Sequence, residues 1–200
     1  MAEKLPALFR EIEQARRAGR DPADLEKRLW KRHGVTCAML VLDSTGFTRT
    51  TREKGIVHFL SIFLHMRSVV GPVFEAHRCL SWRSAADNLF AEFASPDAAL
   101  EAAFSAHHAV ARERILLTAD EPYRVCIGIG CGRVLRGGEE GVFGDEMNLA
   151  CKLGEDLAEG GETLLTASAY GHLRRRKATI FERRESVISG TSIEFYSARR

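Results

Sequence analysis

The sequence has little of what marks a secreted, membrane-spanning or polyanion-binding protein. Its five cysteines are an odd number without CxxC spacing, which argues for reduced thiols and against a disulfide framework or a zinc site. The net charge is only +2, so nothing indicates a nucleic-acid binder. No apolar run approaches the roughly 20 residues of a membrane helix, and the first residues lack the apolar core of a secretory signal. We therefore expect a cytoplasmic protein without a membrane span.

What is present is an ordinary globular composition: 200 residues, 45% of them hydrophobic and 28% charged, enough for one domain with a modest extension. We expect residues 1–34 to form an N-terminal helical extension and residues 35–200 to form the domain. Helical spacing and the pair Asp21-Pro22 predict short helices over 5–17 and 21–32. These helices either pack on their own domain or serve as a dimer contact or a coupling element for a regulatory partner.

The rest of the chain alternates between strand-like and helix-like patterns. Pro72 is expected to bend or restart the helix predicted over 55–77. The order β-α-β-β-α-β predicts a ferredoxin-like α+β sheet with helices on one face and additional C-terminal strands. The expected strands are 37–42, 78–82, 89–93, 123–134, 163–166, 179–184 and 192–196, and the expected helices are 55–77, 95–114, one entered near 145, and 169–175, with a hairpin turn over 83–88.

Two carboxylates stand at the ends of strand-like runs. The apolar run 38–42 ends in Asp43, followed by Ser44, Thr45 and Gly46. Small residues there let backbone N–H groups turn inward and cradle phosphates, while the Asp holds a divalent cation; alternatively, Asp43 only caps the next helix. A second carboxylate, Asp87, lies at the edge of another apolar run. Two such carboxylates on one sheet can share a pair of metal ions.

Two further patterns bear on the site. Residues 128–132 read Gly-x-Gly-x-Gly within a strand, which is not a dinucleotide fingerprint, because that motif lies in a turn that leads into a helix. Glycines along one side of a strand permit close approach by another backbone or by a ligand. In the helix entered near residue 145, Asn148 and Lys152 are four residues apart and share a face.

Three stretches together resemble motifs of the class III nucleotidyl cyclases, the adenylyl and guanylyl cyclase family. Asp43–Thr48 resembles the first metal motif, Arg83–Asp87 resembles the Lys-x-x-Gly-Asp turn, and Gly144–Leu153 resembles the Gly-x-x-Val-Asn-x-Ala-x-Arg-Leu helix. They occur in the family's order and on the expected elements. The resemblance runs from about residue 35 to residue 196 and implies the cyclase α+β fold.

The resemblance implies that the chain converts a nucleoside triphosphate, ATP by default, to a 3′,5′-cyclic nucleotide and pyrophosphate. Asp43 and Asp87 would bind two divalent cations, Mg²⁺ or Mn²⁺; Asn148 would orient the ribose, and Lys152 would stabilise charge on the triphosphate. In the family the metal-binding carboxylates come from one subunit and the helix with the Asn and Arg comes from the other, which implies a homodimer with composite active sites. The implied substrate-binding residues are Ser44, Thr45, Gly46, Phe47, Thr48 and Arg83.

Four positions depart from the family pattern. Lys152 replaces an arginine, which keeps the charge but loses the two-pronged grip on phosphate, so turnover should be slower. Arg83 and Gly141 stand where adenylyl cyclases have the Lys and Asp that read adenine, so GTP and a pyrimidine triphosphate remain alternative substrates. Ala86 replaces a glycine, a mild change if the turn needs no positive φ.

The alternative function is a catalytically weak or inactive cyclase-homology domain that binds nucleotide, dimerises or regulates. The altered base-reading positions and Lys152 favour it, and the intact Asp pair argues against it. A metal-dependent phosphodiesterase is disfavoured because the sequence has no His-Asp metal cluster.

Overall fold

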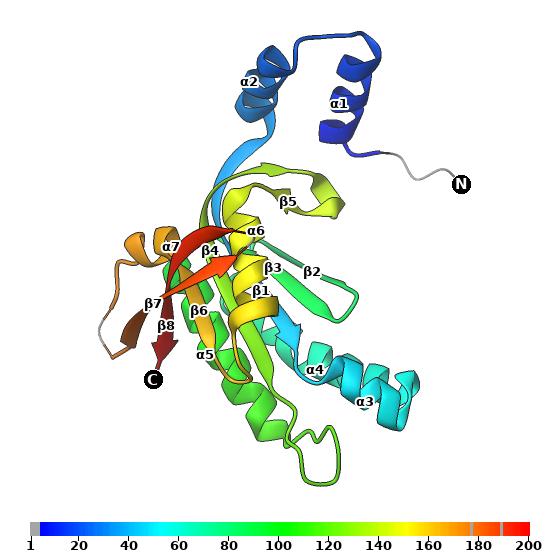
Figure 1. Ribbon diagram of the computed structural model, residues 1–200, viewed down its shortest axis with the longest axis vertical. Helices are drawn as coiled ribbons and strands as arrows, with labels where there is room; N and C mark the ends of the chain where they lie inside the picture. The colour runs from blue at the N-terminus through cyan, green and yellow to red at the C-terminus, as the bar shows by residue number, and fades with distance from the viewer. Residues whose placement is uncertain (1–4, 177, 189) are drawn as a thin grey trace.

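An eight-stranded mixed sheet organises the computed structural model, which describes residues 5–176, 178–188 and 190–200 (Figure 1). The strand order is β2-β3-β1-β4-β6-β8-β7, with β5 paired to β4. Neighbouring strands are antiparallel except β4 and β6, which are parallel. The strands are β1 (Gly34–Ser44), β2 (Ser81–Ala85), β3 (Asn88–Phe93), β4 (Val125–Arg136), β5 (Val142–Phe143), β6 (Thr163–Thr166), β7 (Ile180–Ile188) and β8 (Thr191–Arg199).

The predicted ferredoxin-like fold is confirmed, since the order β2-β3-β1-β4 is that of a βαββαβ unit and β6 to β8 extend it. Helices α4 (Ile56–Ala76), α5 (Pro96–Glu113) and α7 (Ala167–Gly171) contribute to the core on one face. The expectation of helices on one face only was wrong, because α6 (Asp145–Lys152) packs on the other. A π-helical turn, Leu153–Leu157, continues α6.

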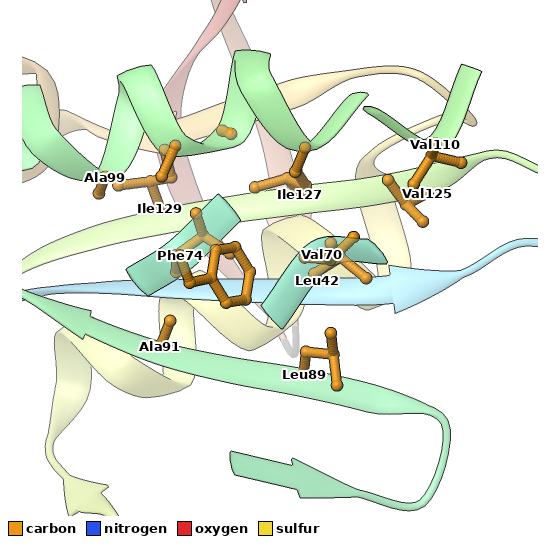
Figure 2. Packing of buried hydrophobic residues seen from close by; sticks show 14 of the residues in the cluster. Leu42, Val70, Phe74, Leu89, Ala91, Ala99, Val110, Val125, Ile127 and Ile129 are labelled. Carbon is orange, nitrogen blue, oxygen red and sulfur yellow. The ribbon is translucent and has the colours of Figure 1, made fainter. Parts of the chain in front are cut away.

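The main core lies between the sheet and helices α4 and α5. Figure 2 shows Leu42 and Ile127 of the sheet with Val70 and Phe74 of α4, and all four side chains are fully buried. The alternation along β1 explains the two faces: Ala38, Leu40 and Leu42 belong to this core, and the residues between them belong to the cluster under α6. Both faces of β1 are therefore buried.

The glycines of β4 allow α6 to approach the sheet closely. A Cβ on Gly128 would lie 2.0 Å from the carbonyl oxygen of Ala150, and one on Gly130 would lie 2.4 Å from that of Glu146. The prediction that these glycines permit close approach is confirmed, and what approaches is the backbone of a helix.

Three local details differ from the expected elements. Helix α3 (Phe47–Lys54) was not among them, and Gly55, at φ +89°, separates it from α4, which matches the helix expected over 55–77. Helix α4 then runs through Pro72 without a break. The hairpin turn is only two residues long, because Ala85 pairs with Asn88, so Arg83 lies in β2 and not in the turn.

Helix α4 also departs from the expectation that no segment is long and apolar enough to cross a membrane, since by length and composition alone it is. In the fold, Phe59, Phe63, Met66 and Phe74 are buried in the main core. This packing is that of a core helix.

The first two helices, α1 (Ala7–Arg17) and α2 (Pro22–His33), precede β1 and lie beyond one end of the sheet, near β5 (Figure 1). Asp21 caps α2 by accepting a hydrogen bond from the N–H of Ala23 at 3.0 Å, as the sequence predicted. The ring of Phe9 in α1 packs edge-on against Phe143 of β5, with centroids 5.4 Å apart. The extension therefore contacts the segment that follows β4.

Candidate active site

Asp43 lies at the end of β1, one residue before the strand ends. By alternation its side chain is on the α6 side of the sheet, with Met39 and Val41. The pKa of Asp43 is raised to about 6. Burial is the largest cause, and the negative charges of Asp87, Glu155 and Asp156 contribute, while the hydrogen bond from the backbone N–H of Ser44 acts in the opposite direction. The carboxylate is thus held where its own charge is unfavourable in the absence of a cation.

Asp87 is the second residue of the β2–β3 loop and is brought to the end of β1. The hydroxyl of Ser44 donates a hydrogen bond to the carbonyl oxygen of Asp87 at 3.1 Å. The two carboxylates predicted to form a metal site are 44 positions apart in the sequence, counted from 43 to 87, and they are neighbours in the fold.

The acidic cluster fits a hard divalent cation. Its donors are carboxylate oxygens, which Mg²⁺ and Mn²⁺ prefer, and a cation would relieve the repulsion that contributes to the raised pKa of Asp43. Within residues 5–176, 178–188 and 190–200, no group of three or more His, Cys, Asp or Glu side chains is arranged to hold a metal ion. Mg²⁺ in phosphate-transfer sites is commonly held by one or two carboxylates together with substrate phosphates, which is what Asp43 and Asp87 offer.

The turn after β1 uses its hydroxyl groups internally. The side chain of Thr45 donates to the carbonyl oxygen of Arg124 at 2.8 Å, and Ser44 is bound to Asp87. Gly46, at φ +78°, occupies the N-cap of α3, and in the described part of the chain no side chain caps this helix. The first N–H groups of α3, at Phe47 and Thr48, therefore remain to bind an anion. Ser44 and Thr45 would contribute through position, not through their hydroxyl groups.

Arg83 and Gly141 are direct neighbours, as a base-reading pair would be. A Cβ on Gly141, which has φ +92°, would lie 2.8 Å from Nε and Nη2 of Arg83. The guanidinium group also lies over the ring of Phe90, 4.5 Å from its centroid. Both residues line a pocket of about 350 Å³ whose walls include Met39 and Met147. This guanidinium stacks on an aromatic ring, and among the described residues its N–H groups donate no hydrogen bond, so they are open to a ligand.

Asn148 and Lys152 lie on α6. Asn148 is exposed, and the ammonium group of Lys152 is 3.4 Å from Oδ2 of Asp156. This is a surface i, i+4 pair of the kind that contributes little stability, so Lys152 can exchange Asp156 for a phosphate at small cost.

Sequence reasoning missed three polar residues around the carboxylates. Tyr123 contacts Ser44, with 2.6 Å between the two oxygens. Asn88 donates from Nδ2 to Glu155 at 2.8 Å, and burial raises the pKa of Glu155, as do Asp156 and Asp87. No signal in the sequence marks these long-range contacts, except that Glu155 follows the third motif by two residues.

No protein-family model matches the sequence, and no curated protein sequence matches it significantly. Solved structures do match. The adenylate/guanylate cyclase/hydrolase from Silicibacter pomeroyi has a TM-score of 0.70 and 20% identity over 82% of this chain and 96% of that one. The guanylate cyclase domain from Catenaria anguillulae, solved in complex with GTP, has a TM-score of 0.67 and 13% identity over 82% and 96%. The adenylyl cyclase CyaB from P. aeruginosa has a TM-score of 0.67 and 16% identity over 84% and 96%.

These neighbours are adenylyl and guanylyl cyclases, and the match covers nearly the whole of each of their chains. At such low identity the likeness establishes the fold. The chain therefore has the fold of the class III nucleotidyl cyclase catalytic domains, the family whose sequence motifs its three stretches resemble.

Proposed function

We propose that the chain is a nucleotidyl cyclase that converts a nucleoside triphosphate to a 3′,5′-cyclic nucleotide and pyrophosphate. The observation that carries this proposal is the meeting of Asp43 and Asp87 at one end of a cyclase-fold sheet, where burial and mutual repulsion raise the pKa of Asp43 to about 6. A purely structural role gives no reason to hold two carboxylates in this arrangement.

The reaction forms a bond between the ribose 3′-oxygen and the α-phosphorus and breaks the bond from that phosphorus to the pyrophosphate oxygen. Two divalent cations held by Asp43 and Asp87 would neutralise the phosphates and favour the ionised 3′-hydroxyl. The N–H groups that open α3 bind phosphate oxygens, Asn148 orients the ribose through its amide, and Lys152 stabilises charge on the triphosphate. Arg83 contacts the base of the nucleotide. The default substrate is ATP.

We propose further that the active unit is a homodimer with composite sites, in which one subunit supplies Asp43 and Asp87 and the other supplies Asn148 and Lys152. In one chain Asn148 is exposed on α6 and Lys152 is engaged with a neighbouring carboxylate, which is consistent with a partner subunit completing the site. Residues 1–34 would be an extension to the catalytic domain of residues 35–200, open to a regulatory partner, and the protein would act in the cytoplasm.

A second candidate function is a nucleotide-binding or dimerisation module without turnover. The lysine at position 152 favours it, because an ammonium group lacks the two-pronged grip on phosphate oxygens of the arginine that the resembled motif has there.

The deciding experiment incubates purified protein separately with ATP, GTP, CTP and UTP, with Mg²⁺ or Mn²⁺, and identifies the products by mass spectrometry. One cyclic product that disappears in Asp87→Ala would establish the enzyme and its base. If a folded, dimeric protein forms no cyclic product from any of the four, the binding-module function replaces the proposal.

A further inference from the structure

Two hydrogen bonds on the side of the sheet that α4 and α5 cover connect a buried tyrosine to the loop that carries Asp87. Ser44 Oγ donates to the carbonyl oxygen of Asp87 at 3.1 Å and lies 2.6 Å from the hydroxyl oxygen of Tyr123. A serine hydroxyl has one proton, and the carbonyl of Asp87 takes it. Tyr123 is therefore the donor to Ser44, and burial, which raises the pKa of Tyr123, keeps that donor protonated.

Two forces act to move the Asp87 loop away from β1. Ala86 has φ +52°, a left-handed conformation that is strained for a residue with a Cβ. The charge of Asp87 also acts against that of Asp43. The loop is exposed at Ala86, so it can relax toward solvent. A tie between β1 and the loop opposes both forces.

Tyr123 is well placed to anchor this tie. Its side chain belongs to the main core and the residue is 3% exposed. Its N–H donates to the carbonyl oxygen of Ile115 at 2.9 Å, and a β-bridge between Leu116 and Pro122 closes the preceding loop. The hydroxyl group thus projects from a fixed point of the core toward the end of β1.

We propose that Tyr123 is a positioning residue for the cation site: through Ser44 it holds the Asp87 loop at the spacing from Asp43 that bound cations require. The inference deepens the proposed function and rests on it. Tyr123 lies outside all three sequence motifs and has no direct contact with either carboxylate among the hydrogen bonds of the described residues. Its influence on the site therefore passes through Ser44.

The first test is Mn²⁺ binding by the intact protein, measured by electron paramagnetic resonance without nucleotide. Tyr123→Phe removes one hydroxyl and keeps the buried ring, and we expect Mn²⁺ to bind about 10- to 100-fold more weakly, the usual effect of losing a residue that supports metal ligands. The matched control is Tyr196→Phe, which removes a tyrosine hydroxyl bound to Glu194, and it should bind Mn²⁺ as the wild type does. Because Tyr123 acts through Ser44, the double variant of Ser44→Ala and Tyr123→Phe should bind no more weakly than Ser44→Ala alone.

The second test does not need the cation. ¹⁵N relaxation in EDTA should show the order parameter of the Asp87 amide falling from a rigid value of about 0.85 to below about 0.6 in Tyr123→Phe. A loss of thermal stability with unchanged Mn²⁺ affinity would make Tyr123 a structural residue only and overturn the proposal. If the wild-type protein binds no Mn²⁺ even with a non-cyclisable ATP analogue present, the cation site and the proposed function fall together, and an unchanged Asp87 order parameter would separately refute the holding of the loop.

Discussion

Ala86 is in a backbone conformation that favours glycine. It is the first residue of the two-residue β2–β3 loop and has φ +52°. The turn therefore does need a positive φ at this position, and alanine in place of glycine is not a mild change here. Ala86→Gly should raise the free energy of unfolding by roughly 0.5–1 kcal/mol, because removal of the Cβ relieves more strain than the added freedom of the unfolded chain costs. Urea denaturation in EDTA measures this change.

Ala85 offers the matched control for that substitution. It is the preceding residue, it is exposed, and it lies in β2 without a positive φ. Ala85→Gly should therefore lower stability by about 0.5–1 kcal/mol, the usual cost of glycine in a strand. Equal effects of the two substitutions would show that the conformation of Ala86 stores no strain.

His107 should make the protein sensitive to acid. Burial lowers its pKa to about 4, while its Nε2 lies 3.0 Å from Oγ1 of Thr163. The His107 side chain takes up a proton near pH 6.5 in the unfolded chain but not in the folded one. Its contribution to the free energy of unfolding is therefore fully present above about pH 6.5 and is lost as the pH falls toward 4, by up to about 3 kcal/mol. His107→Gln should remove that slope, as urea denaturation at several pH values can measure.

The control for this prediction is His108→Gln, the same substitution at the exposed neighbouring residue, which should keep the wild-type slope. Asp43, with its pKa raised to about 6, has the opposite effect in metal-free protein: stability falls as the pH rises from about 3.8 to 6. That contribution is common to all three proteins and cancels in the comparison. Parallel curves for wild type and His107→Gln would contradict the assignment.

At the scale of elements, the sequence predicted what depends on local pattern. The apolar run around Leu40 indicated a strand, and the glycines near Gly128 indicated a close approach by another backbone or by a ligand. The strand is present, and the backbone of α6 makes the close approach. Tertiary packing decided the rest. Helix α4 continues through Pro72 because a buried face on both sides of the proline holds it, and the contact from Tyr123 to Ser44 spans 79 positions. No local pattern encodes such contacts.

Gly128 tests how α6 is held. A Cβ there would lie 2.0 Å from the carbonyl oxygen of Ala150 and 2.6 Å from the backbone nitrogen of Gly154. Gly128→Ala must therefore push α6 off the sheet, and it should cost about 1–3 kcal/mol of stability and reduce activity, since α6 carries Asn148. Gly171→Ala, where a Cβ meets nothing within 4 Å, should leave both unchanged. Thermal unfolding and the product assay measure these effects, and a stable, fully active Gly128→Ala protein would show that α6 adjusts freely.

At the scale of the whole molecule, contacts connect the N-terminal extension to Arg83 and Gly141. Phe9 of α1 packs on Phe143 and lies close to Gly137, in the segment that leads to Gly141. Gly141 in turn lies against Arg83. A displacement of α1 would therefore reach the pocket that Arg83 and Gly141 line through a single loop.

The composite-site model makes a prediction that only the dimer can satisfy. Asp43→Ala and Asn148→Ala should each abolish cyclic product, because each lesion removes one half of both sites. When the two variants are mixed, half of the dimers formed at random carry one of each chain, and each of these keeps one intact site. The mixture should therefore recover about a quarter of the wild-type activity, as expected for a two-fold symmetric dimer. A mixture of Asp43→Ala and Asp87→Ala is the control, and it should recover none, because both lesions fall on the same half. If mixed dimers are shown to form by mass spectrometry and the first mixture stays inactive, each chain must carry its site alone.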